Sequence, residues 1–167
     1  MAGDFPEAAA VSEAVAREGV GDMSTKDFLT KLRHDDIVTA IREAEQKTSG
    51  EIRVFISHRK DVQDPLARAT KRFEKLGMTK TRHRNGVLIY VAPHTRKFAV
   101  VGDTAVHRKC GEVFWSELAA EMTDHFKQSH FSRGIIHAVR KAGDLLAQHF
   151  PPSPDDRNEL SDDVQHD

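Results

Sequence analysis

The sequence lacks the features that mark a secreted or membrane-spanning protein. It has one cysteine, Cys110, in 167 residues, so no disulfide can form within the chain. That usage is typical of a reducing compartment. No stretch approaches the roughly 20 apolar residues that a membrane-spanning helix needs. Residues 1–23 contain acidic side chains and no apolar run of the kind found in signal peptides. We therefore expect a cytoplasmic protein without a membrane span.

A strong net charge is also absent. The formal net charge is −1, so the molecule as a whole has no strong electrostatic preference for a partner. The charge is unevenly spread, because residues 51–110 are rich in Lys and Arg and residues 151–167 are acidic. The basic segment 80–84 has no interleaved aromatic side chains, and we read it as a solvated loop rather than a nucleic-acid site. We expect a monomer and no nucleic-acid partner, and a protein partner for the basic face or the acidic tail stays open.

Familiar catalytic motifs are missing as well. The chain has no Gly-x-Ser-x-Gly elbow, no P-loop and no dinucleotide fingerprint. The histidines from His125 to His149 lack the i, i+4 spacing of a helical zinc pair, so zinc is unsupported. Cys110 follows Lys109, which could lower the pKa of the thiol. No local signature pairs Cys110 with a catalytic histidine, and we expect a buried or idle thiol.

What the sequence does contain is an alternation of helical and strand patterns. A helix near 35–48 has Asp35 or Asp36 as its expected cap and Gly50 as its expected end. Asp64 and Pro65 mark the start of a second helix, and Gly77 marks its end. The remaining expected elements are strands over 51–57, 87–92 and 97–102 and helices over 112–127 and 132–150, the last with Ser132 as its cap.

The order of these elements predicts an α/β fold, a three-layer α/β/α sandwich with a small mixed sheet. The first two strands flank a helix, so they should be parallel with a right-handed crossover. The third strand follows a short turn and should pair antiparallel with the second. We expect three regions: a flexible N-terminal arm over 1–27, in which residues 6–18 could form a transient helix, the α/β domain over 28–150, and a flexible acidic tail over 151–167.

This topology brings several functional groups to one rim of the sheet. The strand starts at Glu51 and Asn85, the strand end at Asp103, and the following residues His107 and Glu112 should meet there. Hard cations such as calcium prefer clusters of carboxylate and carbonyl oxygens. Asp103, in a Gly-Asp-Thr turn, is the best single candidate, although it could simply cap the turn. Glu112 could likewise serve only a helix N-terminus.

The opposite rim of the sheet is a rival location. Ligands in open α/β sheets bind beyond the carboxyl ends of parallel strands. That rim should carry His58, Asp61, Asp64, His94 and Thr95. Asp64 already has an explanation as a helix cap.

Several segments in order are similar to one known family. Residues 48–54, Thr-Ser-Gly-Glu-Ile-Arg-Val, resemble the opening strand of the TPM domain family, and residues 85–91, Asn-Gly-Val-Leu-Ile-Tyr-Val, resemble its central strand. Residues 98–103, the Phe114-Trp115 helix and residues 131–135 resemble later segments, and the similarity spans roughly residues 28–150. The resemblance implies an α/β/α sandwich, a divalent-cation site, often for calcium, beside acidic loops, and phosphatase activity in some members.

Together these observations give two functional hypotheses. The first is a TPM-like domain that binds a divalent cation, with calcium as the expected ion, and has phosphatase activity on an unknown substrate. Asp103, Glu112 and Glu51 would hold the metal. Arg84, His107 and Asn85 would contact the phosphate or substrate, with His107 also placed for proton transfer. The alternative is a non-catalytic domain that binds a protein partner.

Overall fold

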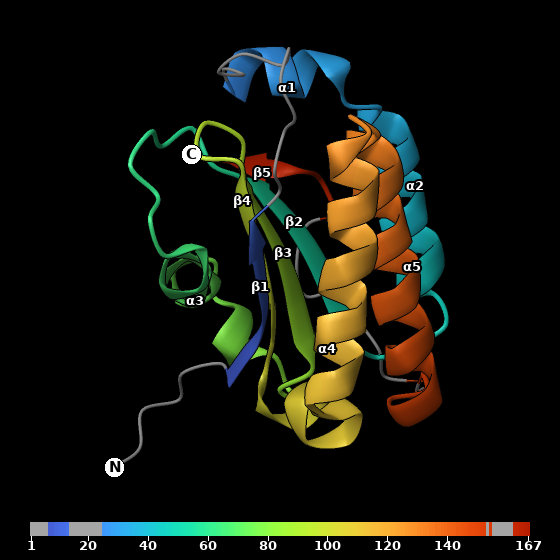
Figure 1. Cartoon of the computed structure of the whole chain (residues 1–167). Coiled ribbons are helices and arrows are strands. Elements are labelled where there is room, and N and C mark those ends of the chain that lie inside the picture. The colour runs from blue at the N-terminus through green and yellow to red at the C-terminus, as the bar shows by residue number, and fades with distance from the viewer. Residues whose placement is uncertain (1–6, 14–24, 153, 155–161) are drawn as a thin grey trace.

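Helices cover both faces of a mixed sheet in the computed structural model, which describes residues 7–13, 25–152, 154 and 162–167 (Figure 1). The α/β sandwich predicted from the sequence is therefore confirmed. In chain order the elements are β1 (Glu7–Glu13), α1 (Thr25–Lys31), α2 (His34–Glu45), β2 (Glu51–Ile56), α3 (Pro65–Lys75), the short 3-10 helix η1 (Met78–Lys80), β3 (Gly86–Ala92), β4 (Lys97–Gly102), α4 (Thr104–Lys127), α5 (Phe131–His149) and β5 (Gln165–His166).

The sheet has the strand order β1-β4-β3-β2-β5. β2 and β3 are parallel, with Glu51 opposite Gly86, and β3 and β4 are antiparallel, with Val87 opposite Gly102. Both pairings were predicted from the connection lengths. Because β4 runs backwards, its end lies beside the starts of β2 and β3, so each rim of the sheet carries the side chains expected there.

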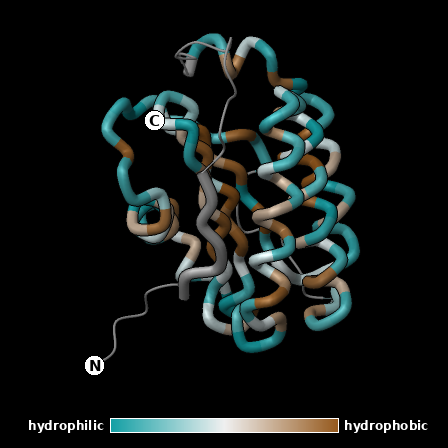
Figure 2. Tube along the Cα trace, in the orientation of Figure 1, coloured by the Kyte–Doolittle hydropathy of each residue, from teal (hydrophilic) through white to brown (hydrophobic). Residues whose placement is uncertain are grey.

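The core lies on both faces of the sheet. α2, α4 and α5 pack on one face through a large apolar cluster that includes Ile41, Trp115 and Leu146, and α3 packs on the other through Phe73. All seven residues of β3 are buried, and a continuous apolar run such as residues 87–92 is typical of a strand covered on both faces. Figure 2 shows the hydrophobic residues concentrated along the strands between two layers with more polar outer surfaces.

Two terminal segments differ from the prediction. In place of a loose arm, residues 7–13 form β1, which pairs antiparallel with β4. In place of a fully flexible tail, Gln165 and His166 form β5, which pairs parallel with β2. Both are edge pairings, which the free edges of a three-stranded sheet readily accept because their backbone groups are otherwise unpaired. The boundaries of the three predicted regions stay predictions.

The helix ends confirm some predicted caps and correct others. Asp64 caps α3 by accepting a hydrogen bond from the Ala67 amide (3.1 Å), and Gly77 follows the helix with φ of 75°. α2 instead begins after Arg33 without a side-chain cap and ends at Glu45. Gly50 does not end it; a Cβ there would lie 2.9 Å from Leu146, so close packing explains this glycine.

The segment after β4 is helical, which the sequence did not indicate. α4 begins at Thr104 and changes direction at Gly111, whose φ of 72° breaks the helical path. The expected start at Glu112 is thus the second half of a longer element. Val113, in the second half of α4, is 70% exposed. Ser132 does not cap α5, which begins after His130; its Oγ instead accepts a hydrogen bond from the Arg33 amide (3.0 Å).

Candidate functional site

The rim predicted to hold a metal ion contains a buried ion pair. Asp103 is fully buried, and its two carboxylate oxygens each accept a hydrogen bond of 2.8 Å from the guanidinium of Arg84. The Thr104 amide donates to Oδ1 of the same carboxylate (2.7 Å), so Asp103 also caps α4. A bidentate arginine pair of this kind is among the stronger polar contacts in proteins. Asp103 therefore joins the entry of β3 to the start of α4.

Glu51 belongs to a separate charged cluster. It is 2% exposed and lies near Glu45, Arg53 and Asp162. Burial raises the pKa of Glu45 to about 11, and the neighbouring carboxyl groups of Asp162 and Glu51 add to the rise. Burial also lowers the pKa of Arg53, while the negative charges of Glu51, Glu45 and Asp162 oppose that shift. The cluster thus places three carboxyl groups and one guanidinium close together at this edge of the fold.

The other three predicted residues lie on the same rim but have different surroundings. Asn85 is 1% exposed and donates a hydrogen bond from Nδ2 to Ser49 Oγ (3.1 Å). His107 is half-buried in the first half of α4, and Glu112 is exposed just after Gly111. The topology therefore brings Glu51, Asn85, Asp103, His107 and Glu112 to one end of the sheet, where Arg84 also lies. The side chains of Asp103 and Arg84 bind each other, and backbone hydrogen bonds join the Glu51 amide to the Asn85 carbonyl (3.4 Å) and the His107 amide to the Asp103 carbonyl (3.0 Å).

The family resemblance implies a cation, and a cation site requires a set of suitably placed oxygen ligands. Calcium takes six to eight oxygen ligands, with carboxylates prominent among them. In the part of the chain that the structure describes, no three His, Cys, Asp or Glu side chains are arranged to hold a metal ion. At Asp103 both carboxylate oxygens already bind Arg84. The residues in this arrangement do not fit a calcium ion unless Arg84 withdraws.

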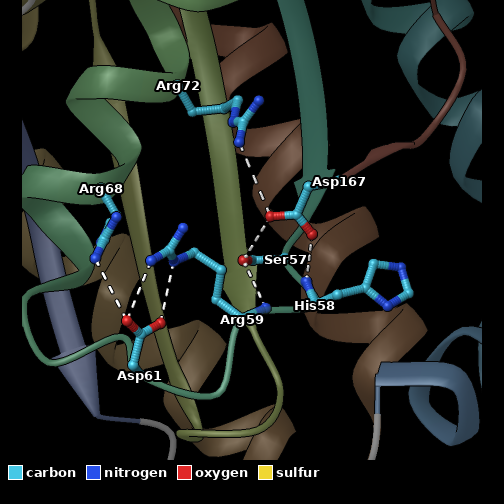
Figure 3. A network of polar contacts seen from close by, with 7 residues as sticks. All are labelled: Ser57, His58, Arg59, Asp61, Arg68, Arg72 and Asp167. Atoms are coloured by element: carbon cyan, nitrogen blue, oxygen red, sulfur yellow. Dashed lines mark hydrogen bonds and ion pairs between the residues drawn. The ribbon is translucent and has the colours of Figure 1, made fainter.

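The opposite rim, the rival location, carries a network of polar contacts centred on a carboxylate (Figure 3). Ser57 Oγ donates to Oδ2 of Asp167 (3.1 Å), and the backbone amide of His58 donates to Oδ1 (2.5 Å). A guanidinium nitrogen of Arg72 lies 3.9 Å from Oδ2. Since β5 pairs with the end of β2, Asp167 comes beside Ser57 directly past the carboxyl end of a parallel strand. The side chain of Asp167 is thus bound as an anion by two other segments of the chain.

A second carboxylate, Asp61, lies beside the first and binds two more arginines. Arg59 donates to both oxygens of Asp61 (3.1 Å each), and Arg68 approaches to 3.7 Å. The hydrogen bond from Arg59 is the main cause that lowers the pKa of Asp61. Three arginines from the loop after β2 and from α3 therefore converge on two carboxylates at this rim.

Two stacked aromatic rings, Phe55 and Tyr90, lie beside this network, and Arg72 packs on the first of them. Its guanidinium carbon lies 4.4 Å from the centroid of the Phe55 ring, and Phe55 stacks on Tyr90 with ring centroids 5.7 Å apart. Burial is the main cause that raises the pKa of Tyr90, and a hydrogen bond with Ser57 acts in the opposite direction. This contact orients the guanidinium of Arg72 over the ring.

Part of this network was predicted from the sequence. His58 and Asp61 were expected at this rim and lie there, although His58 contributes its backbone amide. Ser57 and Arg72 were not predicted, although the sequence carried signals for both: a polar residue at the end of a buried strand, and an arginine on the outer face of α3. Asp167 carried no such signal, because its position depends on a pairing between residues more than a hundred apart.

Comparisons with known proteins agree with this fold. The model of the TPM domain matches residues 23–145, and the chain therefore belongs to the TPM domain family. It is similar to the NMR structure of the BA42 protein from the psychrophilic bacterium Bizionia argentinensis, with a TM-score of 0.74 and 36% identity over 82% of this chain and 96% of that chain. No curated protein matches. None of the helices in the described residues has the length and hydropathy to cross a membrane.

Proposed function

We propose that this TPM domain binds a phosphate-bearing ligand at the rim formed by Ser57, His58 and Arg72. The observation that carries the proposal is the convergence of a hydroxyl, a backbone amide and a guanidinium on the Asp167 carboxylate. These three donors suit any oxyanion, and Asp167 stands in for one. Their position past the carboxyl ends of β2 and β3 is where ligands of open α/β sheets bind.

The charges around this rim favour phosphate over a neutral ligand. Arg59, Arg68 and Arg72 exceed the carboxylates Asp61 and Asp167 in number. A phosphate group has more acceptor oxygens than a carboxylate, so it can use Arg68 or Arg59 in addition to the donors that hold Asp167. Arginine is well suited to this role because its planar guanidinium donates two parallel hydrogen bonds to one oxyanion.

The proposal is tested by following backbone amide NMR shifts during a titration with inorganic phosphate at moderate salt. Saturable shifts at Ser57, His58 and Arg59 are expected. Arg72→Gln should weaken phosphate binding by about tenfold, as expected for a lost charge-assisted hydrogen bond. Lys75→Gln, which removes the same charge one turn further along α3, should change the affinity less than about twofold. Shifts elsewhere, or equal weakening by both variants, would reject this site.

Phosphatase activity is the further part of the proposal, supported by membership of the TPM family and by the phosphate-compatible donors at this rim. This activity requires hydrolysis in addition to binding. Release of inorganic phosphate from p-nitrophenyl phosphate, measured with and without calcium or magnesium, distinguishes hydrolysis from binding alone. Turnover that Arg72→Gln lowers and Lys75→Gln does not would support an enzyme. Phosphate binding without turnover would support the alternative, a non-catalytic binding domain.

Divalent-cation binding is a separate proposal that rests on family membership. At the predicted residues Asp103, Glu112 and Glu51, a cation has to compete with Arg84 for the Asp103 carboxylate. A calcium titration with magnesium as control should then give saturable amide shifts near Asn85, Asp103 and residues 107–112. Arg84→Gln should tighten calcium binding, since it removes the competitor. If calcium causes no saturable shift in either protein, the cation site at this rim is rejected.

A further inference from the structure

A groove between α2 and α5 lies apart from both rims of the sheet. It has a volume of about 460 Å³ and is lined from α5 by Arg133, His137 and Arg140 and from the α2 side by Arg33, Asp36 and Glu43. Pockets of 300–1,000 Å³ are the usual size for small-molecule ligands. On α5 the spacing of four and then three residues puts the three cationic or titratable side chains on one helical face. The groove is therefore large enough for a ligand and carries two arginine side chains along its α5 wall.

The groove is fixed at both ends by packing of the two helices. At one end the Arg33 amide donates a hydrogen bond to Ser132 Oγ (3.0 Å). At the other end Gly143 packs against Ala44, where a Cβ on the glycine would come within 2.7 Å of the alanine Cβ. These two contacts also show that α2 and α5 run in the same direction, with their N-termini together. The two helices that form the groove are thus in contact at both of its ends.

A second, smaller hollow of about 230 Å³ adjoins the N-terminal end of α5. Lys31, His130 and Ser132 line it, and Arg33 and Arg133 line both hollows. Neither α2 nor α5 has a side-chain cap at its N-terminus. The first amides of a helix are donors without intrahelical partners, and the helix dipole favours negative charge at that end. The smaller hollow is therefore a second place for an anionic group.

The cationic side chains around the two hollows are only partly neutralised. Arg33 pairs with Asp36 at 3.4 Å, and Glu121 binds His137 and lies 3.8 Å from Lys141. The guanidiniums of Arg133 and Arg140 and the ammonium group of Lys31 make no ion pair within the described residues. Positive charge in excess of its carboxylate partners attracts anions.

We infer that the two hollows together bind one small molecule that carries two neighbouring phosphate groups. One phosphate would lie in the groove against Arg133 and Arg140, and the other in the smaller hollow against Lys31 and the start of α5. Arg33 and Arg133 line both hollows and can bridge the two groups. Ile136 and Ala40 provide an apolar part of the lining, against which the carbon portion of such a molecule can pack. This site is independent of the rim at Ser57.

His125 lines the groove, so its pKa can show whether the site is filled. Its pKa is lowered first by burial, then by the charges of His137, His130 and Arg133, while Asp124 acts in the opposite direction. Its ring lies 5.5 Å from that of His137, centroid to centroid. A bound dianion would stabilise the protonated imidazole. The NMR-titrated pKa of His125 should therefore rise when the site is filled.

The experiment is calorimetric titration of the full chain with inorganic pyrophosphate, inorganic phosphate and citrate at about 150 mM salt, where weak surface attraction is screened. Pyrophosphate should bind at least about tenfold more tightly than phosphate, as expected when a second charged group gains its own hydrogen bonds. Citrate separates a preference for phosphate from a general preference for polyanions. Citrate binding equal to that of pyrophosphate would overturn the assignment of phosphate, and the absence of saturable pyrophosphate binding would overturn the site.

Variants locate the binding. Arg133→Gln and Arg140→Gln should each weaken pyrophosphate binding by about tenfold and abolish the rise in the His125 pKa. Lys127→Gln, a charge-matched change at the end of α4, should leave the affinity within about twofold. Arg72→Gln at the Ser57 rim, where pyrophosphate can also bind, should leave the rise in the His125 pKa intact. Equal weakening by Lys127→Gln would mean non-specific attraction. Loss through Arg72→Gln alone would assign the binding to the rim at Ser57, and so separates this site from the proposed function.

Discussion

Arg84 binds both carboxylate oxygens of Asp103, with Nε to Oδ2 and Nη2 to Oδ1 distances of 2.8 Å. Arg84 adopts a left-handed backbone conformation with φ of 52°, which costs a non-glycine residue on the order of 1 kcal/mol. The conformation directs its side chain to Asp103, and the backbone carbonyl of Arg84 accepts from the Ala105 amide (3.3 Å). The pair therefore closes the junction between the entry of β3 and the start of α4.

Asp103→Asn should lower the stability of the fold. The change removes the negative charge that binds the Arg84 guanidinium, at the fully buried side chain of residue 103. Breaking such a pair costs about 3 kcal/mol. For a chain of this size that corresponds to a fall in melting temperature of about 6–12 °C. Thermal unfolding followed by circular dichroism measures it. Glu112→Gln, on an exposed residue of the same rim, is the control and should unfold like the wild type.

Glu45→Gln should stabilise the protein increasingly as the pH rises. The folded pKa of Glu45 is about 11 against an ordinary value of 4.5, so above the ordinary value the folded state keeps a proton that the unfolded state releases. The stability that protonated Glu45 contributes to the folded state is fully present below the unfolded pKa. It is lost as the pH rises towards the folded pKa. The variant should therefore gain on the order of 1 kcal/mol over wild type for each unit of pH between about pH 5 and pH 9. Glu117→Gln, on the exposed surface of α4, should show no such trend in denaturant unfolding.

Cys110 should react slowly with thiol reagents. Burial raises the pKa of its thiol to about 11, and the thiolate is the reactive form. At about pH 8 the reaction with iodoacetamide should be on the order of 100-fold slower than for a free cysteine. Mass spectrometry of the alkylated chain gives the rate, and addition of denaturant should restore normal reactivity. Rapid alkylation of the folded protein would contradict the burial of this thiol.

Asp167→Asn should tighten binding of inorganic phosphate at the Ser57 rim. The side chain of Asp167 occupies the donors from Ser57 and His58, so it competes with the ligand. Loss of its charge should raise the phosphate affinity by about threefold to tenfold, measured from the same amide NMR titration. Asp144→Asn, an exposed change of equal charge on α5, is the control. Unchanged affinity for phosphate in the Asp167 variant would show that this carboxylate does not compete.

Local signals along the chain were sufficient for most of the fold. The cap at Asp64 and the end at Gly77 depend on backbone preferences of a few neighbouring residues. The apolar run from Val87 indicates by its composition that this strand is buried. The helix over 104–110 was missed because its local sequence, with Gly111 at its end, resembles a loop. Ser132 was assigned as a cap because its residue type suits that role, whereas contact with Arg33 decided its hydrogen bond.

The sequence by itself determined the sandwich, the sheet pairings of the three central strands and the gathering of Glu51, Asn85 and Asp103 at one rim, because hydrophobic period and connection length act within short segments. Only the tertiary structure decided which charges meet. Arg84 with Asp103 and Ser57 with Asp167 are contacts between residues 19 and 110 positions apart. Such contacts depend on strand register, on the reach of the side chains and on burial. The spacing of residues along the chain predicts none of these.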